Sequence, residues 1–333
     1  MKLVTFQLRS GEPSAAPRAG VLLNEDRVLD LGRAAGDDAG AVAQLGSVMA
    51  ILQHGSKAME LARCLADAAG DHPDATYNMA DVTLLSPVPR PGSLRDCLAF
   101  ERHLINCMRT AARWRSPLLP QLDRLCERVL GRGFLRPPKV WYKQPIYYKG
   151  NPASVVGHEA NVIWPAYTEK LDYELEFGVF IGKEGKNIRE GRGAEHIAGY
   201  AVFNDFSARD VQLAEMAGRL GPAKGKDFDT GNAIGPWLTT VDEVPDPYDL
   251  KMTARVNGQT WSETSSRAMQ FSFEEIIAHI SQDETLYPGD FIGAGTAPGG
   301  CGLELDRWIQ PGDVVELEVE HLGVLRNRVV RGT

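Results

Sequence analysis

The stretch from Leu171 to Gly182, LDYELEFGVFIG, constrains the fold more than any other part of the chain. Polar and apolar residues alternate in its first half, and the apolar ones are aromatic or branched, which predicts a β-strand. The alternation places Asp172, Glu174 and Glu176 on one face of that strand. Because three neighbouring carboxylates repel one another, we expect this face either to lie open to water, as in many antiparallel sheets, or to hold a cation.

The composition is that of an ordinary globular protein, with 24% charged and 43% hydrophobic residues among 333. The formal charge of −8 disfavours nucleic acid and anionic membrane surfaces as partners. The sequence has no apolar run long enough to cross a bilayer, and its start reads as a strand rather than a signal peptide. Five cysteines lack paired metal-ligand spacing and predict free thiols in a cytoplasmic protein: Cys64, Cys97, Cys107, Cys126 and Cys301.

Residues 1–85 predict a small N-terminal domain rich in β-structure, and residues 90–333 predict a second, larger domain. In the first, strands are expected at 4–8, 19–23, 27–31 and 81–85. Two helices are expected between residues 42 and 69, broken at 54–56. The proline-rich run 86–91 can continue neither a helix nor a strand, so it marks the boundary.

The larger domain predicts a mainly β, α+β architecture. A helix should follow residues 95–103, and another should span 274–280. Short strands are expected at residues 137–142, 146–148, 153–156, 197–203, 250–256, 290–293 and 314–321. Because strands and helices do not alternate, we expect an irregular sandwich or roll rather than a doubly wound α/β fold.

Four acidic residues are candidate ligands for a hard cation such as Mg²⁺, Ca²⁺ or Mn²⁺, since all offer oxygen and none has a Cys or His at zinc-type spacing: Asp96, Glu174, Glu176 and Asp205. Asp205 ends an apolar strand, where an unpaired carboxylate is costly. It can equally cap a helix that starts just after it. The sequence leaves both interpretations of Asp205 open.

Two glycine-containing loops carry further candidates. The loop 220–231 includes Lys226, which can stabilise an enolate or carboxylate beside a metal, or can be a solvated surface lysine. It lacks the residue order of a phosphate-binding loop. The loop 293–305 contains Glu304 between two leucines, where a half-buried carboxylate needs a partner such as histidine. Cys301 in the same loop has no base near it in sequence, which favours a packed thiol over a nucleophile.

Together these motifs resemble the fumarylacetoacetate hydrolase family over about residues 90–330. The resemblance lies in the segments 172–176 (DYELE), 204–212 (NDFSARDVQ) and 225–230 (GKDFDT), in Gly295-Thr296, and in the seven-residue separation of Asp96 and His103. It implies a catalytic domain built as a mixed β-sheet roll, usually a homodimer, with the N-terminal unit as a small extension.

The resemblance also implies roles for single residues. Asp96, Glu174, Glu176 and Asp205 would ligate the metal. His103 would be the general base, oriented by Glu304, and Lys226 would be the third catalytic residue. Substrate contacts would come from Tyr148, Arg209, Gln212, Thr230 and Thr296.

This sequence departs from the family pattern where the substrate is recognised. Leu98 and Met216 replace substrate-contacting residues, and Ala112 stands in place of an arginine for a distal carboxylate. Arg113 or Arg115 would then have to supply that positive charge.

The implied activity is metal-dependent hydrolysis of a C–C bond in a 1,3-diketone, an acylpyruvate or a β-diketo acid, as in the catabolism of aromatic compounds. Water activated by His103 would attack a carbonyl, and an enolate held by the cation would leave. The alternatives are decarboxylation, hydration or tautomerisation of a 2-oxo acid on the same fold. A non-catalytic cation-binding module is disfavoured, because it has no use for the pair of His103 and Glu304.

Overall fold

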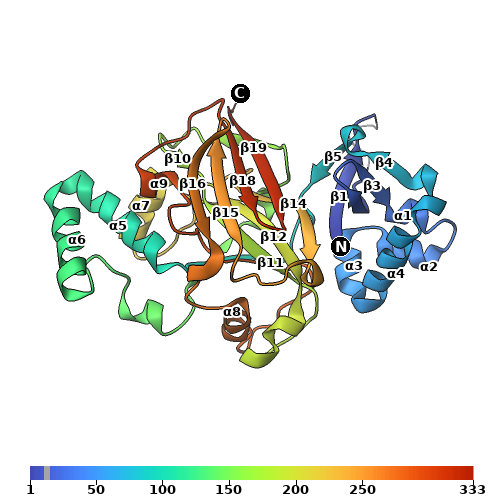
Figure 1. Ribbon diagram of the computed structural model, residues 1–333, viewed down its shortest axis with the longest axis horizontal. Helices are drawn as coiled ribbons and strands as arrows, with labels where there is room; N and C mark the ends of the chain where they lie inside the picture. The colour runs from blue at the N-terminus through green and yellow to red at the C-terminus, as the bar shows by residue number, and fades with distance from the viewer. Residues whose placement is uncertain (11–15, 333) are drawn as a thin grey trace.

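The computed structural model describes residues 1–10 and 16–332. Two β-sheets pack face to face at its centre, the N-terminal unit lies at one end, and a pair of helices projects at the other (Figure 1). The fold is therefore the mixed α+β class that the sequence predicts. No helix in the described part of the chain is long and apolar enough to cross a membrane.

The N-terminal unit is a small sheet covered by short helices. Its strands are β1 (Lys2–Leu8), β2 (Arg18–Asn24), β3 (Arg27–Asp30), β4 (Thr76–Asn78) and β5 (Val82–Leu85). Its helices are α1 (Leu31–Ala34), α2 (Ala39–Leu45), α3 (Val48–His54) and α4 (Ser56–Asp67).

The predicted helix break at residues 54–56 is confirmed, because Gly55 adopts a positive φ of 67° between α3 and α4. A second break was not predicted. Ser47 caps α3 by accepting a hydrogen bond from the backbone N–H of Ala50, so the segment holds three helices rather than two.

The first sheet has 12 strands and runs through both units. Its order is β4-β3-β2-β1-β14-β12-β11-β17-β6-β7, with β5 paired to β1 and β8 paired to β14. Strand β1 pairs with β14 at Leu3 and Leu238, so the first 85 residues share a sheet with the rest of the chain. The division into domains at residues 85–90 stays a prediction. The remaining strands of this sheet are β6 (Leu94–Cys97), β7 (Tyr147–Gly150), β8 (Val155–Val156), β11 (Leu175–Ile181), β12 (Ile197–Asp205), β14 (Asn232–Thr240) and β17 (Phe291–Gly293).

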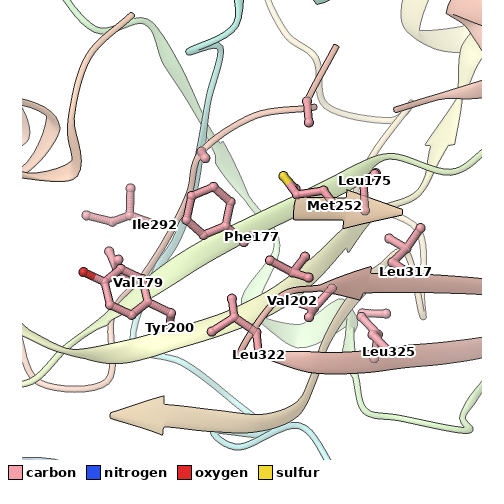
Figure 2. Packing of buried hydrophobic residues seen from close by; sticks show 14 of the residues in the cluster. Leu175, Phe177, Val179, Tyr200, Val202, Met252, Ile292, Leu317, Leu322 and Leu325 are labelled. Carbon is pink, nitrogen blue, oxygen red and sulfur yellow. The ribbon is translucent and has the colours of Figure 1, made fainter. Parts of the chain in front are cut away.

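A second, five-stranded sheet lies against the first, in the order β16-β15-β18-β19-β9. Apolar side chains fill the space between the sheets, with Leu175 and Phe177 of β11 facing Met252 of β15 and Leu317 of β18 (Figure 2). This core fixes the positions of β11 and β12. The strands are β9 (Asn161–Trp164), β15 (Lys251–Val256), β16 (Gln259–Ser265), β18 (Val314–Val319) and β19 (Gly323–Arg331), and a separate pair consists of β10 (Leu171–Asp172) and β13 (Ser207–Ala208).

The helices of the larger unit are α5 (Glu101–Arg115), α6 (Leu118–Leu130), α7 (Arg209–Ala217), α8 (Phe273–Ile280) and α9 (Gly302–Leu305). The predicted helix at 274–280 is confirmed as α8, which starts with a capping box formed by Ser272 and Glu275. Helix α6 was not predicted from the sequence. It packs on α5 through buried Arg109, whose guanidinium donates to Asp123 (2.8 Å) and Glu127 (2.6 Å).

Two strand predictions need correction. Residues 137–142 form no strand, because Lys139–Tyr142 is a 3₁₀ turn that follows two prolines. The predicted strand at 171–182 is interrupted at Tyr173 and Glu174, which separate β10 from β11. Its acidic face is not open to water, since Asp172, Glu174 and Glu176 are all buried. A face of buried carboxylates requires cationic partners.

Candidate active site

Three of the four predicted metal ligands come together. Asp96 lies on β6, Glu176 on β11 and Asp205 at the end of β12, and these strands belong to the consecutive series β12-β11-β17-β6. One carboxylate oxygen from each residue lies within 4.8 Å of the others, and all three side chains are buried. We call Asp96, Glu176 and Asp205 the acidic cluster.

Glycines make room for this cluster. A Cβ atom on Gly293 of β17 would collide with Oδ1 of Asp96, so only glycine fits between β6 and β11 at that level. Gly295 adopts a φ of 87° and donates its backbone N–H to the same oxygen (3.1 Å). Part of the glycine-rich loop at 293–305 therefore positions a carboxylate.

The electrostatics of the acidic cluster favour a bound cation. Burial, reinforced by the charge of Asp205, raises the pKa of Asp96 to about 8. Burial and the Asp96 carboxylate raise the pKa of Glu176 well above its usual value. Among the described residues, Oε2 of Glu176 and Oδ1 of Asp205 have no hydrogen-bond partner. Unsatisfied, mutually repelling carboxylate oxygens are a donor set that fits a hard divalent ion.

Glu174 lies beside this cluster but has cationic partners of its own. Arg209 donates to its Oε1 (2.7 Å) and Lys226 to its Oε2 (2.5 Å). Although burial opposes ionisation, these two cations hold the pKa of Glu174 well below its usual range. Lys226 also contacts Asp205 and is buried, so it is not the solvated loop lysine that the sequence allowed. The structure thus places Glu174 in a salt-bridge network, and its role as a ligand stays a prediction.

The cap interpretation of Asp205 is wrong. Helix α7 begins at Arg209 after Ala208, and no side chain caps its start. Asp205 instead interacts with Lys226 and accepts a hydrogen bond from the hydroxyl of Tyr148 (2.6 Å).

His103 and Glu304 form a hydrogen-bonded pair, as the sequence predicts. Nδ1 of His103, in the first turn of α5, lies 2.7 Å from Oε1 of Glu304 in α9. The other carboxylate oxygen accepts hydrogen bonds from Asn106 (2.9 Å) and from the backbone of Gly299 (2.8 Å). Although burial opposes its charge, the carboxylate of Glu304 helps hold the pKa of His103 well above its usual value. Because Glu304 occupies Nδ1, Nε2 is the nitrogen left to exchange a proton with a ligand.

Asp172 anchors the loop that carries Glu304, and sequence reasoning gave it no role. Its carboxylate accepts hydrogen bonds from the backbone N–H groups of Gly302 (2.7 Å) and Leu303 (2.9 Å), and from Nε of Arg209 (2.8 Å). The guanidinium of Arg209 therefore links Asp172 to Glu174. The one signal in the sequence was that Asp172 begins the alternating acidic segment.

A cavity of about 410 Å³ is lined both by Asp96 of the acidic cluster and by the imidazole of His103. Of the predicted substrate contacts, Tyr148, Arg209, Gln212 and Thr296 line it, together with Asp96, His103, Glu174 and Lys226. Thr230 does not line it; its hydroxyl accepts a hydrogen bond from the backbone of Ile163 in β9. The rest of the wall is mostly apolar: Leu98, Leu104, Met108, Ala111, Ile146, Leu213, Met216 and Leu303.

The expected substitute for the missing distal arginine is not found. Arg113 is not among the residues that line this cavity, and it forms an ion pair with Asp306 (2.8 Å). Arg115 is exposed and does not line it either. The residues that line this cavity therefore include no arginine from α5 for a second carboxylate.

Neutralising one carboxylate of the acidic cluster should stabilise the metal-free protein. In Glu176→Gln we expect a higher melting temperature without metal near neutral pH, because the raised pKa of Glu176 means that folding must either bury its charge or take up a proton, and glutamine requires neither. We also expect the variant to lose the stabilisation by Mn²⁺, about 2.7 kcal/mol at a concentration 100 times the dissociation constant. Thermal unfolding with and without Mn²⁺ measures both effects, with the exposed Glu263→Gln as control. An equal response to Mn²⁺ in Glu176→Gln and wild type would contradict this prediction.

The chain matches a known protein family and is similar in sequence to curated relatives. Residues 127–330 match the family model for the C-terminal domain of fumarylacetoacetate (FAA) hydrolase. A mitochondrial oxaloacetate tautomerase of Bos taurus is 42% identical over 191 residues, which are 56% of this chain and 60% of the relative. This chain therefore matches less than two thirds of the length of that relative.

Solved structures align over the whole chain. A probable 2-hydroxyhepta-2,4-diene-1,7-dioate isomerase from Mycobacterium abscessus has a TM-score of 0.68 at 25% identity, with all of both chains covered. A maleylpyruvate hydrolase from Sphingobium sp. SYK-6, in complex with manganese(II) and pyruvate, has a TM-score of 0.71 at 23% identity, again with both chains fully covered. Since the family model covers more than half of the sequence, this chain belongs to the fumarylacetoacetate hydrolase family.

Proposed function

We propose that the protein is a divalent-cation-dependent hydrolase that cleaves an acylpyruvate into a carboxylic acid and pyruvate. The observation that carries this proposal is one cavity lined by Asp96 of the acidic cluster, by Lys226 and by His103, whose imidazole is paired with Glu304. A cation held by Asp96, Glu176 and Asp205 would polarise the substrate oxygens as a Lewis acid.

The side chains provide the remaining chemistry. In its neutral form, which higher pH favours because its pKa is raised, His103 takes a proton from water, and Glu304 keeps the imidazole oriented and stabilises the positive charge that develops. The water oxygen adds to the acyl carbonyl, and the bond from that carbon to the methylene group breaks. The electron pair of this bond leaves as the enolate of pyruvate, whose negative charge Lys226 stabilises. A proton returned from His103 to the methylene carbon completes pyruvate.

The apolar residues that line most of the cavity wall favour a substrate whose acyl group has no terminal charge. Each CH₂ group buried there should contribute about 0.8 kcal/mol, or about fourfold in kcat/KM. We therefore expect kcat/KM to rise from acetylpyruvate to longer straight-chain acylpyruvates until the cavity is full. An analogue of equal length that ends in a carboxylate should be a poorer substrate, because that charge would be buried unpaired.

Loss of diketone absorbance across such a series measures the preference. The variant Met216→Arg places a cation at the apolar wall and should shift the preference toward the carboxylate-ended analogue. Faster turnover of that analogue by the wild-type protein would contradict an apolar acyl group.

The tautomerase relatives favour tautomerisation of a 2-oxo acid as a second candidate. His103 would then move a proton between carbon and oxygen, and no water would be consumed. Reaction in water enriched in the heavy oxygen isotope separates the two activities. Hydrolysis places one heavy oxygen atom in the released acid, whereas tautomerisation releases no acid. The homodimer, the cytoplasmic location and a part in aromatic catabolism stay predictions.

A further inference from the structure

A second group of metal-ligand atoms lies in the wall of the same cavity, around His103. His103 and Cys107 are four residues apart on α5 and therefore lie on one face of the helix. Cys301 directly precedes α9. One imidazole nitrogen and the two sulfur atoms all lie within 4.8 Å of one another, and the acidic cluster contributes none of them.

The individual distances are close to those in a tetrahedral metal site. Sγ of Cys107 lies 3.8 Å from the ring nitrogens of His103, and Sγ of Cys301 lies 3.7 Å from Oε1 of Glu304. A zinc ion with bonds of about 2.3 Å to sulfur and about 2.0–2.1 Å to nitrogen holds two such ligands about 3.6 Å apart. Turning of the imidazole and opening of its 2.7 Å contact with Glu304 would place four donor atoms around one ion.

We propose that His103, Cys107, Cys301 and Glu304 form a binding site for a soft divalent cation such as Zn²⁺ or Cd²⁺. Thiolate and imidazole select such ions over Mg²⁺ and Ca²⁺, whereas the all-oxygen acidic cluster has the opposite preference. His103 and Cys107 line the cavity, so an ion can reach the site by the route that the substrate uses.

Binding must displace protons from the two thiols. Burial raises the pKa of Cys301 well above the usual value of a thiol, so Cys301 is a neutral thiol in the metal-free site. The ion would also engage the imidazole and the carboxylate of the catalytic pair. An ion bound there should therefore inhibit hydrolysis. Only this expected inhibition rests on the proposed function.

Cadmium is the probe for the site, because thiolate ligands give Cd²⁺ an ultraviolet charge-transfer band that oxygen ligands do not give. The full chain, reduced and freed of metal, is titrated with Cd²⁺ while excess Mg²⁺ saturates the acidic cluster. We expect one Cd²⁺ per chain with a thiolate band, and at least tenfold weaker binding in Cys107→Ser and in Cys301→Ser. Cys126→Ser on α6 and Cys64→Ser on α4 are the matched controls, and they should bind as the wild type does.

Cys107 is only half-buried, so Cys107→Ser tests the site even if the buried Cys301→Ser fails to fold. A wild-type protein without the band would overturn the proposal, as would an unchanged band in Cys107→Ser. If Cd²⁺ binds with the band but an acylpyruvate is not hydrolysed even without Cd²⁺, the site stands and the proposed function falls.

Discussion

Replacing His103 with Gln should lower kcat by about 10²–10⁴-fold, because that is the usual contribution of a general base. The glutamine amide can still donate to Glu304, so the geometry of the loop is kept while the ability to accept a proton is lost. Binding of Mn²⁺ should stay close to that of the wild type, since His103 is not in the acidic cluster. Turnover of an acylpyruvate at saturating Mn²⁺ measures the loss.

His54→Gln, on α3 of the N-terminal unit, is the control for this substitution and should keep full activity. If His103→Gln kept wild-type turnover, another group would have to be the base. If His103→Gln lost Mn²⁺ binding as well, the proposal that the acidic cluster binds the ion without His103 would be in doubt.

Replacing Arg209 with Met should lower the free energy of unfolding by about 3–5 kcal/mol, the usual cost of leaving buried charges without their partner. Arg209 is 3% exposed, and it lies between Asp172 and Glu174, which are also buried. Its removal would leave Asp172 to hold the α9 loop without a counter-charge. Urea unfolding followed by circular dichroism measures the loss.

Arg192→Met is the matched control, because Arg192 also pairs with a carboxylate, that of Glu195, but at the surface. Its substitution should leave the free energy of unfolding almost unchanged, because water screens an ion pair at the surface. Similar losses in both variants would mean that the buried network around Arg209 contributes no more to stability than a surface ion pair.

The sequence predicted the parts of the site that local patterns encode. Alternation along β11 predicted the acidic face on which Glu176 lies near Asp96 and Asp205, and the apolar strand before Asp205 marked a carboxylate that needs a partner. The pairing of His103 with Glu304 followed from the family resemblance, since a lone glutamate between leucines indicates only that some partner is needed.

The rest depends on tertiary contacts that no local pattern contains. Cys301 had no base near it in sequence, yet folding brings α5 against α9 and places His103 within 4.8 Å of its sulfur. Thr230 fits the family motif, but its hydroxyl binds the backbone of Ile163 instead of lining the cavity. Alternation did not reveal that Arg209 and Lys226, distant in sequence, form ion pairs with Glu174, whose role as a ligand stays a prediction.

We propose above all that Asp96, Glu176 and Asp205 bind one divalent cation beside the pair of His103 and Glu304. Electron paramagnetic resonance of Mn²⁺ tests it directly, because the signal of free Mn²⁺ decreases as the ion binds. Titration of the metal-free protein should show one tightly bound Mn²⁺ per chain, and this binding should be lost in Glu176→Gln but kept in His103→Gln. Failure of the wild type to bind Mn²⁺, or equal binding by Glu176→Gln, would contradict the account.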